Sequence, residues 1–434
     1  MRRKKALLPL AATALVGMVL GTGSPAFGSE PLPQVVSQIP AAYTPHIATD
    51  GTGSLPLALA VGQSEDGTTM YVGGRFQVAE NADRSTTYPR DNIMAFDADT
   101  GALTDFAPDL NAPVYAILGV DDSVYVGGEF STVNGVARPA LVKLDASTGA
   151  MDTTFNPVAI PGGRVSEIRL VNDRLIVGGT FRAKLLALNP ITGKNTGYIG
   201  LPIVGKLPLT NSKPEVYRFA VNPDGTRLVG VGNFLTVDGQ DRKRAFMLDL
   251  GADKATLSPW YYAPLDKKCL SNTPTRQAYL DDVDFSPDGS YFVFASTGFV
   301  QPEWPAQTFT AICDAAARFE TNILEPRLPT WINYTGGDTL HSVAVTGAAV
   351  YVQGHNRWLD NPYGKDSLGE GGLVRKGIGA LDSQTGEALD WNPVKPAAQG
   401  GQDFLATETG LWVASDSLRF GGKYHRGIAF APLP

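Results

Sequence analysis

The chain has 434 residues, of which 43% are hydrophobic and 18% charged, with a net charge of −7 at pH 7. This hydrophobic content excludes a disordered chain, and the acidic charge argues against nucleic acid as a partner. The 48 glycines and 31 prolines, at low charge, are typical of many short strands joined by tight turns.

Residues 1–28 have the features of a secretory signal peptide. A basic start, MRRKK, precedes an apolar stretch from Ala6 to Gly21 and the small-residue segment SPAFGSE. The apolar stretch is short for a membrane span, no second one follows, and no cysteine near the cut offers a lipid anchor. We therefore predict cleavage near Gly28 and a secreted, extracellular chain with no wall-sorting motif. That mature chain has 32 basic and 43 acidic residues, a net charge of −11.

A short motif with paired glycines recurs along the mature chain. YVGGRF, YVGGEF, IVGGTF and VGVGNF begin at residues 71, 125, 176 and 229, at spacings of 54, 51 and 53. Weaker copies begin at Val293, Tyr351 and Trp412. A period of this length indicates one supersecondary unit repeated along the chain. Because Ala-Ser replaces the glycine pair in two copies, we interpret the motif as scaffold and not as a phosphate-binding loop.

Each copy lies inside a longer frame of predicted strands. An apolar strand and a turn such as PDG (Pro223 to Gly225) precede it, and a polar loop, a further strand and a turn such as FDADTG (Phe96 to Gly101) follow. A last strand ends in an aromatic residue and a proline. Four strands per unit and seven units predict an all-β fold, a seven-bladed β-propeller. The blades are expected to start at about residues 55, 113, 162, 215, 277, 338 and 400 of a single domain, residues 29–434.

The seventh unit stops at Pro434 without its fourth strand. The aromatic-x-Pro signature of that strand recurs near the N-terminus, in YTPHIATDG from Tyr43 to Gly51. We therefore expect an N-terminal strand, at about residues 35–50, to complete blade seven. Such pairing closes the ring and removes the exposed edge of an open sheet.

The frame resembles a family of secreted bacterial propellers with YVGG-x-F units, which are related to the delta-sixty repeat proteins and are met mostly in actinobacteria. The resemblance covers nearly all of the mature chain and includes the stretch from Trp331 to Trp358. It implies a propeller architecture and no established catalytic activity. Members often accompany adhesion-type modules, which this chain lacks.

Cys269 and Cys313 are the two cysteines of the chain. In an exported protein an even pair favours one disulfide, which would tie together the long outer segments of blades four and five.

Arginines recur at one position of the unit, seven residues before the second turn, at Arg90, Arg138, Arg182, Arg242 and Arg375. A ring of arginines could bind an anionic glycan. We favour the alternative that each holds its own loop through hydrogen bonds to carbonyl or carboxylate oxygens.

The inner strands offer one equivalent position per blade toward the central funnel. Counting back from each turn places Asp281, His341 and Asp403 there in three neighbouring blades. A histidine flanked by carboxylates can exchange a proton near neutral pH, so this trio is a candidate for acid-base work. The alternative is a set of hydrated polar residues that line a central channel.

Blade six carries a long insertion from His355 to Gly377. Long ordered loops on a rigid scaffold often carry function. His355, Arg357, Trp358 and Tyr363 could form a platform for sugar rings or a partner protein. Trp304 of blade five, and Tyr424 and His425 of blade seven, are candidates to join it. The alternative is a loop that folds on itself with Trp358 as its plug.

Common catalytic and nucleotide-binding signatures are missing from the sequence. We therefore predict a monomeric, non-catalytic binding module without cofactor or metal, for a cell-surface glycan or protein. The rival hypothesis is an enzyme that acts on extracellular glycans through Asp281, His341 and Asp403. A third possibility is a structural exported protein without a discrete site.

Overall fold

The computed structural model describes residues 30–49, 51, 55–207, 213–266, 269, 279–298, 311–325, 328–396 and 400–434. The predicted signal peptide and Trp304 lie outside the described residues. Within the described residues, no helix is long and apolar enough to cross a membrane.

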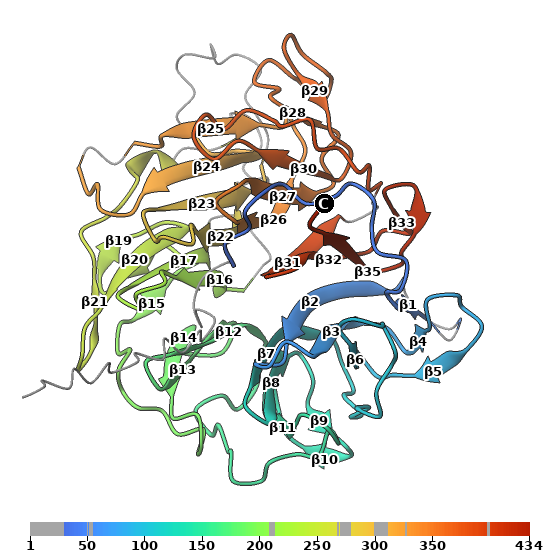
Figure 1. Ribbon diagram of the computed structural model, residues 1–434. Helices are drawn as coiled ribbons and strands as arrows, with labels where there is room; N and C mark the ends of the chain where they lie inside the picture. The colour runs from blue at the N-terminus through green and yellow to red at the C-terminus, as the bar shows by residue number, and fades with distance from the viewer. Residues whose placement is uncertain are drawn as a thin grey trace, which may run out of the picture.

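Antiparallel sheets follow one another along the chain and are arranged around a central axis (Figure 1). Their first strands are β2 (Leu57–Gln63), β7 (Val114–Val120), β12 (Val165–Val171), β16 (Glu215–Val221), β22 (Leu280–Phe285), β26 (Leu340–Val345) and β31 (Gly401–Thr407). Their second strands are β3 (Thr69–Arg75), β8 (Ser123–Gly128), β13 (Arg174–Gly179), β17 (Arg227–Asn233), β23 (Tyr291–Ser296), β27 (Val350–Gly354) and β32 (Gly410–Ser415). The third strands are β6 (Ile93–Asp97), β11 (Leu141–Asp145), β14 (Leu185–Leu188), β20 (Ala245–Leu250), β24 (Ala315–Glu320), β30 (Ile378–Leu381) and β35 (Ile428–Pro432).

Fourth strands are regular in two sheets, as β21 (Ala255–Leu257) and β25 (Trp331–Tyr334). In four other sheets single bridges stand at this place, such as Phe96 with Leu103. A 3-10 helix, η1 (Ala263–Asp266), follows β21.

Short hairpins connect second to third strands on the outside of several sheets. They are β4 (Val78–Glu80) with β5 (Thr87–Pro89), β9 (Thr132–Val133) with β10 (Val136–Ala137), β18 (Thr236–Val237) with β19 (Gln240–Asp241), β28 (Trp358–Leu359) with β29 (Leu373–Val374), and β33 (Arg419–Phe420) with β34 (Lys423–Tyr424). The connection that enters a sheet pairs with that sheet's hairpin where β1 (His46–Ala48) joins β4, where β15 (Ile203–Val204) joins β18, and through a single bridge between Leu110 and Val133 of β9. These hairpins therefore hold the segments that connect one sheet to the next.

The glycine pairs lie at the ends of the second strands, as the YVGGEF copy in β8 illustrates. A Cβ atom on Gly127 would lie 2.6 Å from Cγ1 of Val165 in the next sheet. One on Gly128 would lie 2.4 Å from the carbonyl oxygen of Pro113 in its own sheet. The first glycine therefore lets neighbouring sheets pack, and the second lets the backbone approach closely. These contacts support the scaffold interpretation of the motif.

The core lies between neighbouring sheets. The first strands contact one another in chain order, and β31 contacts β2. A cluster around Trp260 contains Phe292, Phe294 and Phe319 in edge-to-face or tilted contacts. Another joins Trp412 and Phe430 of the last sheet to residues of the first. Packing of this kind fixes each sheet against its two neighbours.

The N-terminal segment differs from the strand predicted at about residues 35–50. It runs antiparallel to β35, where Ser37 and Ala41 donate backbone hydrogen bonds to the carbonyls of Pro432 and Phe430, at 2.8 and 2.9 Å. These are single contacts and not a ladder, so β31, β32 and β35 form a three-stranded sheet. The segment's only strand, among the described residues, is β1, which pairs with β4. Pro40 and Pro45 lack the backbone N–H that a continuous ladder needs.

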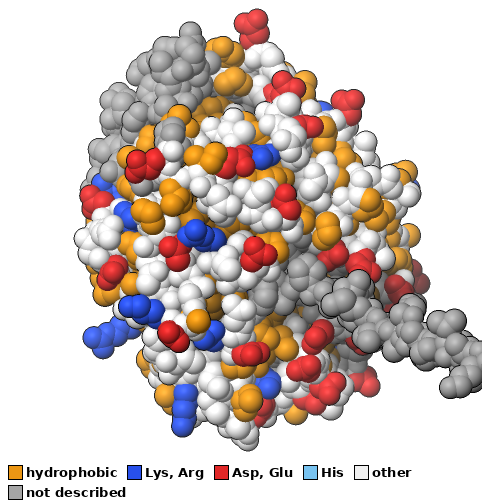
Figure 2. Space-filling view, turned by 60° about the vertical axis from the view of Figure 1, so that its left-hand side comes forward, with side chains coloured by type: hydrophobic (Ala, Val, Ile, Leu, Met, Phe, Trp, Pro, Cys, Tyr) orange, Lys and Arg blue, Asp and Glu red, His pale blue; other side chains and the backbone are white. Residues whose placement is uncertain are grey.

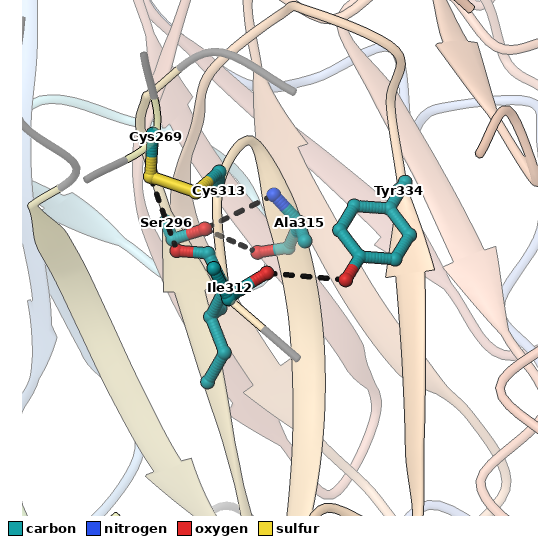
Figure 3. The surroundings of a disulfide bond; sticks show 7 residues. Cys269, Ser296, Ile312, Cys313, Ala315 and Tyr334 are labelled. Carbon is teal, nitrogen blue, oxygen red and sulfur yellow. Dashed lines mark hydrogen bonds between the residues drawn. A yellow bond between two sulfur atoms is a disulfide. The ribbon is translucent and has the colours of Figure 1, made fainter. Parts of the chain in front are cut away.

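The predicted disulfide between Cys269 and Cys313 is present (Figure 3). It joins the chain after η1 to the residues that enter β24, so it connects two neighbouring sheets. Beside it, Ser296 Oγ accepts a hydrogen bond from the Ala315 amide and donates one to the Ala315 carbonyl, both at 3.0 Å. The prediction from cysteine number and compartment is therefore confirmed.

Candidate functional site

Two cavities lie along the axis, on either side of Arg218. The first, which we call the funnel pocket, has a volume of about 200 Å³ and lies at the beginnings of the first strands. The second, the axial chamber, measures about 340 Å³ and lies toward their ends. Arg218 lines both cavities.

A β-bulge in every one of these first strands builds the funnel pocket. In β26, for example, the ladder jumps from Leu340 to Ser342, so His341 is the extra residue and its side chain lines the pocket. The equivalent residues are Leu59, Tyr115, Ser166, Tyr217, Asp281, His341 and Gln402. All of them line the funnel pocket. A repeated backbone irregularity therefore gathers residues that differ from sheet to sheet.

Asp281 and His341 meet in this pocket. His341 Nδ1 lies 2.7 Å from Asp281 Oδ2, and about a quarter of each side chain is exposed. The ring of His355, at the start of the blade-six insertion, lies 5.8 Å from that of His341, nearly perpendicular to it. Burial and the charge of His341 lower the pKa of His355. The sequence analysis grouped Asp281 with His341 and assigned His355 to the insertion, and the structure brings the three side chains together.

Asp403 does not share the position of Asp281 and His341, contrary to the expectation. Gln402 is the bulged residue of β31, and Asp403 lies one residue further, in the axial chamber. Its Oδ2 accepts a hydrogen bond from the Val61 amide at 2.9 Å. The turn after β31 spans only the two residues between Thr407 and Gly410, and an error of one residue in locating it shifts the whole count.

An ion pair that the sequence reasoning missed forms the opposite wall of the pocket. Arg164 binds the buried carboxylate of Glu215 with two nitrogens, at 2.9 and 2.6 Å, and its guanidinium stacks over Tyr115. Ser166 Oγ also donates to Glu215. Arg164 and Glu215 both stand two residues before the bulge, in neighbouring units. Comparing that position across all units would have found them.

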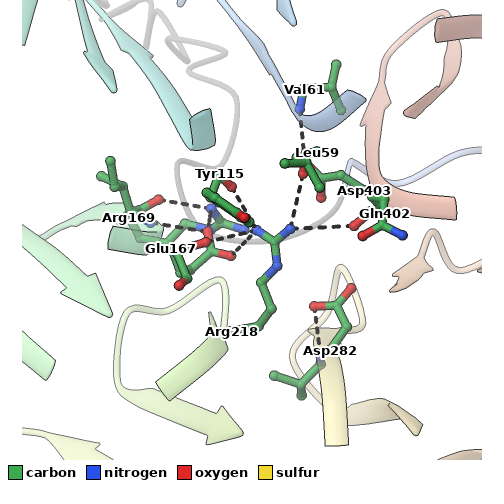
Figure 4. Close-up of polar contacts among 12 residues, drawn as sticks. Leu59, Val61, Tyr115, Glu167, Arg169, Arg218, Asp282, Gln402 and Asp403 are labelled. Carbon is green, nitrogen blue, oxygen red and sulfur yellow. Dashed lines mark hydrogen bonds and ion pairs between the residues drawn. The ribbon is translucent and has the colours of Figure 1, made fainter. Parts of the chain in front are cut away.

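Arg218 separates the two cavities by bridging several sheets (Figure 4). Its guanidinium donates to Glu167 Oε2 at 3.0 Å and to the carbonyl oxygens of Ser166 at 3.1 Å and Leu59 at 3.4 Å. Longer contacts reach the carbonyls of Tyr115 and Gln402. Burial lowers the pKa of Arg218, but neighbouring carboxylates raise it by more, so the group stays charged. One side chain therefore ties β16 to β2, β7, β12 and β31.

The blade-six insertion is held mainly by its own polar contacts. Arg357 binds the buried carboxylate of Asp338 at 2.7 Å, contacts Asp366 and stacks over the ring of Trp358 at 4.1 Å. Asn361 holds the loop by accepting from the Gly369 amide and donating to the carbonyl of Ser367. Trp358 is half-buried. Tyr363 is 56% exposed, which leaves its ring available at the surface.

Tyr424 and His425 lie in a different place from the insertion. His425 Nδ1 is 2.8 Å from Thr44 Oγ1, and its ring lies near that of His46. Tyr424 packs edge-to-face on His46 and carries Arg84 over its ring at 4.4 Å. Both residues therefore belong to the junction between the N-terminal segment and the last sheet, which we call the latch (Thr44, His46, Arg84, Tyr424 and His425).

The repeated arginines hold their own units. The guanidinium groups of Arg90, Arg138, Arg242 and Arg375 donate to the carbonyls of Thr104, Phe155, Ser258 and Leu389, which lie on the outer segment of the same unit. This arrangement supports the structural interpretation for these four residues. Among the residues that the structure describes, no group of three or more His, Cys, Asp or Glu side chains is placed to hold a metal ion.

Comparisons with known proteins agree with this architecture. A family model described as a domain of unknown function, DUF5122 beta-propeller, matches residues 121–155. No curated protein matches the chain. The solved structure of RRP9 WD40 repeats is similar over 92% of this chain and 100% of its own, with a TM-score of 0.53 and 10% sequence identity. The fold is a β-propeller. At 10% identity this likeness shows the fold alone, so the function must be argued from the site.

The funnel pocket is the propeller's most differentiated surface. Its bulged residues differ in type from unit to unit, and the pocket contains a histidine, two tyrosines and paired charges. Such a concave site with a few converging polar groups is where small polar ligands bind.

Proposed function

We propose that this protein is a secreted, non-catalytic binding module that holds an extracellular glycan or protein partner in the funnel pocket. In this proposal the sheets are seven blades of one ring, which the N-terminal segment closes by bridging the last sheet and the first. The disulfide supports an oxidising, extracellular location.

The observation that carries the proposal is the composition of the funnel pocket. Arg164 pairs with Glu215, Arg218 with Glu167, and His341 with Asp281. The pocket thus offers hydrogen-bonding groups and the rings of Tyr115 and Tyr217 with its charges already paired. Hydroxyl-rich ligands such as sugars suit such a lining because hydroxyls bond to donors and acceptors while ring faces pack on tyrosine. On the face in Figure 2, acidic and basic side chains are interspersed, so this face presents no patch of one sign of charge.

A glycan array probed with residues 29–434 tests the binding function. We expect a glycan to bind, and we expect Tyr217→Ala, which removes a ring from the pocket, to abolish that binding. Trp358→Ala tests whether the blade-six insertion contributes to binding. Val158→Ala is the control, because this side chain is 70% exposed at the surface. Binding that survives Tyr217→Ala contradicts the funnel pocket as the site. An array without any bound glycan would leave a protein as the partner.

Removal of residues 29–50 tests ring closure. This deletion takes away the contacts of Ser37 and Ala41 with β35 and the pairing of β1 with β4. We expect a large loss of thermal stability and greater sensitivity to proteolysis, because it exposes two sheet edges. An unchanged melting temperature would contradict closure by this segment.

A second candidate is a glycan-active enzyme, and the short contact between Asp281 and His341 is what favours it. A carboxylate that holds a histidine in place beside a pocket can assist proton transfer. Without Asp403 at the same position, the acid-base pair of this alternative reduces to Asp281 and His341. Reducing-sugar release from any glycan that binds, lost in His341→Gln while binding persists, would establish the enzyme.

A further inference from the structure

The axial chamber has a lining unlike that of the funnel pocket. Its walls come from several sheets and combine apolar side chains, such as Val61, Ile117, Leu118, Val343 and Leu405, with the carboxyl groups of Glu65 and Asp284. At about 340 Å³ it falls within the size range of small-molecule sites. The walls therefore suit a ligand with an apolar body.

The end of the chamber that meets Arg218 is a layer of charged groups from different sheets (Figure 4). Glu167 pairs with Arg218 at 3.0 Å and also contacts Arg169. Asp282 Oδ2 accepts from the Val343 amide, and Asp403 Oδ2 from the Val61 amide, both at 2.9 Å. All these carboxyl groups line the chamber. The layer is therefore a rigid floor whose carboxylates are held by backbone donors of the neighbouring sheets.

The floor contains more carboxyl groups than guanidinium groups. Three carboxyl groups, on Glu167, Asp282 and Asp403, surround the enclosed guanidinium of Arg218, and Arg169 is more exposed. Burial, against the attraction of Arg218, raises the pKa of Asp403 to about 6, and burial raises that of Asp282 well above its usual value. Protons thus compensate part of the excess negative charge, and a cationic ligand could replace them.

A further polar group at this level of the strands is the buried hydroxyl of Ser342. Ser342 occupies the same strand position as Asp282 and Asp403, in the sheet between theirs. It is fully buried, and its Oγ has no hydrogen-bond partner among the described residues. An unsatisfied buried hydroxyl is costly, and this one adjoins Val343, which lines the chamber, although Ser342 itself does not.

We propose that the axial chamber binds a small organic cation, with its ammonium or guanidinium group against the carboxylates of Asp282 and Asp403 and its apolar body along the chamber walls. This site lies on the opposite side of Arg218 from the funnel pocket and is independent of the function proposed for that pocket. An anion is disfavoured because it would meet the excess carboxylates, and a neutral ligand would leave the charge imbalance in place.

Calorimetric titration with three probes of one shape tests the proposal. We choose 2-phenylethylammonium as the cation, 2-phenylethanol as its neutral counterpart and 3-phenylpropionate as the anion. At pH 7.5 the cation is expected to bind at least about tenfold more tightly than either comparator. Its affinity should fall as the pH is lowered to 5, because the carboxylates that attract it become protonated.

Matched variants locate the binding. Asp403→Asn keeps the shape of the floor but removes a charge, and it should weaken binding of the cation at least about tenfold. Leu405→Trp, at a half-buried wall position, should block the chamber and serves as the second variant if the first fails to fold. Asp281→Asn in the funnel pocket is the control and should bind the cation as the wild type does.

Equal binding of the cation and the alcohol would overturn the proposal, as would no detectable binding of the cation. So would cation binding that is unchanged in both Asp403→Asn and Leu405→Trp. A loss caused by Asp281→Asn alone would place the cation in the funnel pocket and would also overturn it.

Discussion

At the centre of the molecule, the guanidinium group of Arg218 performs two tasks. It hydrogen-bonds to carbonyl oxygens on several first strands, and it lies among the carboxyl groups of Glu167, Asp282 and Asp403. Its role follows from the bulge in β16, which turns residue 217 into the funnel pocket and residue 218 across the axis. Single residues therefore acquire functions here from a backbone feature that no local motif reveals.

Replacing Arg218 should cost more stability than replacing any surface arginine. Arg218→Met leaves Glu167, Asp282 and Asp403 without their central positive charge, and we expect a loss of about 3–5 kcal/mol at pH 7. The loss should shrink toward pH 5, where protonation removes the uncompensated charge. Chemical denaturation at both pH values measures it. Arg169→Met, at a side chain 37% exposed, is the control and should cost less than about 1 kcal/mol. Equal losses in the two variants would contradict the central role of Arg218.

The second glycine of the repeated pair should tolerate no side chain. A Cβ on Gly74 would lie 2.0 Å from the backbone oxygen of Leu57, which cannot move without distorting the bulge in β2. Gly74→Ala should therefore destabilise the protein by about 1–3 kcal/mol. Gly162→Ala is the matched control, since a Cβ there meets nothing within 4 Å, and it should change stability by less than about 0.5 kcal/mol. Melting curves of the two variants measure this difference in stability. Identical curves would contradict the packing argument.

At the scale of strands and loops, the sequence predicted the elements better than their partners. The glycine motif, the turn residues and the apolar runs placed the first, second and third strands correctly, because period-two patterns and turn chemistry are local properties. The pairing of strands, in contrast, depends on residues far apart in the sequence. The N-terminal segment carries the aromatic-x-Pro signature of a fourth strand, yet β1 pairs with β4, since prolines interrupt the contact with β35. The prediction that Asp403 faces the funnel was wrong for a related reason. The position was counted back from the turn after β31, and an error of one residue in locating that turn changes which residue is assigned to the bulge.

The disulfide is the element whose contribution can be measured most directly. Cys269 and Cys313 are 44 residues apart, so reduction frees a long loop in the unfolded chain. Loop-closure entropy predicts that Cys269→Ser with Cys313→Ser lowers the free energy of unfolding by about 4 kcal/mol. Denaturant titration of the double variant, compared with the wild type with and without reductant, checks this value. Reductant should shift the wild type to the variant's midpoint and leave the variant unchanged, and a shift in the variant would contradict the assignment.

At the scale of the whole molecule, contacts along the axis and in the latch join sheets that come from distant parts of the chain. Each sheet must pack on two neighbours, and the first and last sheets come from opposite ends of the chain. Arg218 joins several sheets at the centre, while the N-terminal segment crosses from β35 to β4 at the periphery. Repetition in the sequence predicted the propeller, but these joints involve residues that occur once. A search for what the repeat does not share leads to them as well as to the funnel pocket.

The latch makes the stability of the molecule depend on pH. His425 is buried against Thr44 and His46, and burial, followed by the charge of His46, lowers the pKa of His425 to about 4 from 6.5. Burial likewise lowers the pKa of His46, which Arg84 and Arg426 also disfavour as a cation. Because the folded state disfavours the charged form, the stabilisation is complete above pH 6.5 and is lost as the pH falls toward 4.

We expect the acid loss of stability to depend on His425. Between pH 7.5 and 4.5 the wild type should lose about 1–3 kcal/mol more of its free energy of unfolding than His425→Gln, in which the group no longer titrates. Asp403 acts in the opposite direction, since its raised pKa favours folding as the pH falls, but it is common to both proteins and cancels in the difference. Denaturant titrations at several pH values measure the two curves. Hydrogen exchange should show that the amides of residues 36–48 lose protection first on acidification, because the latch holds this segment to the last sheet. Parallel curves for the two proteins would contradict the role of His425, and early exchange elsewhere would move the acid-sensitive joint away from the latch.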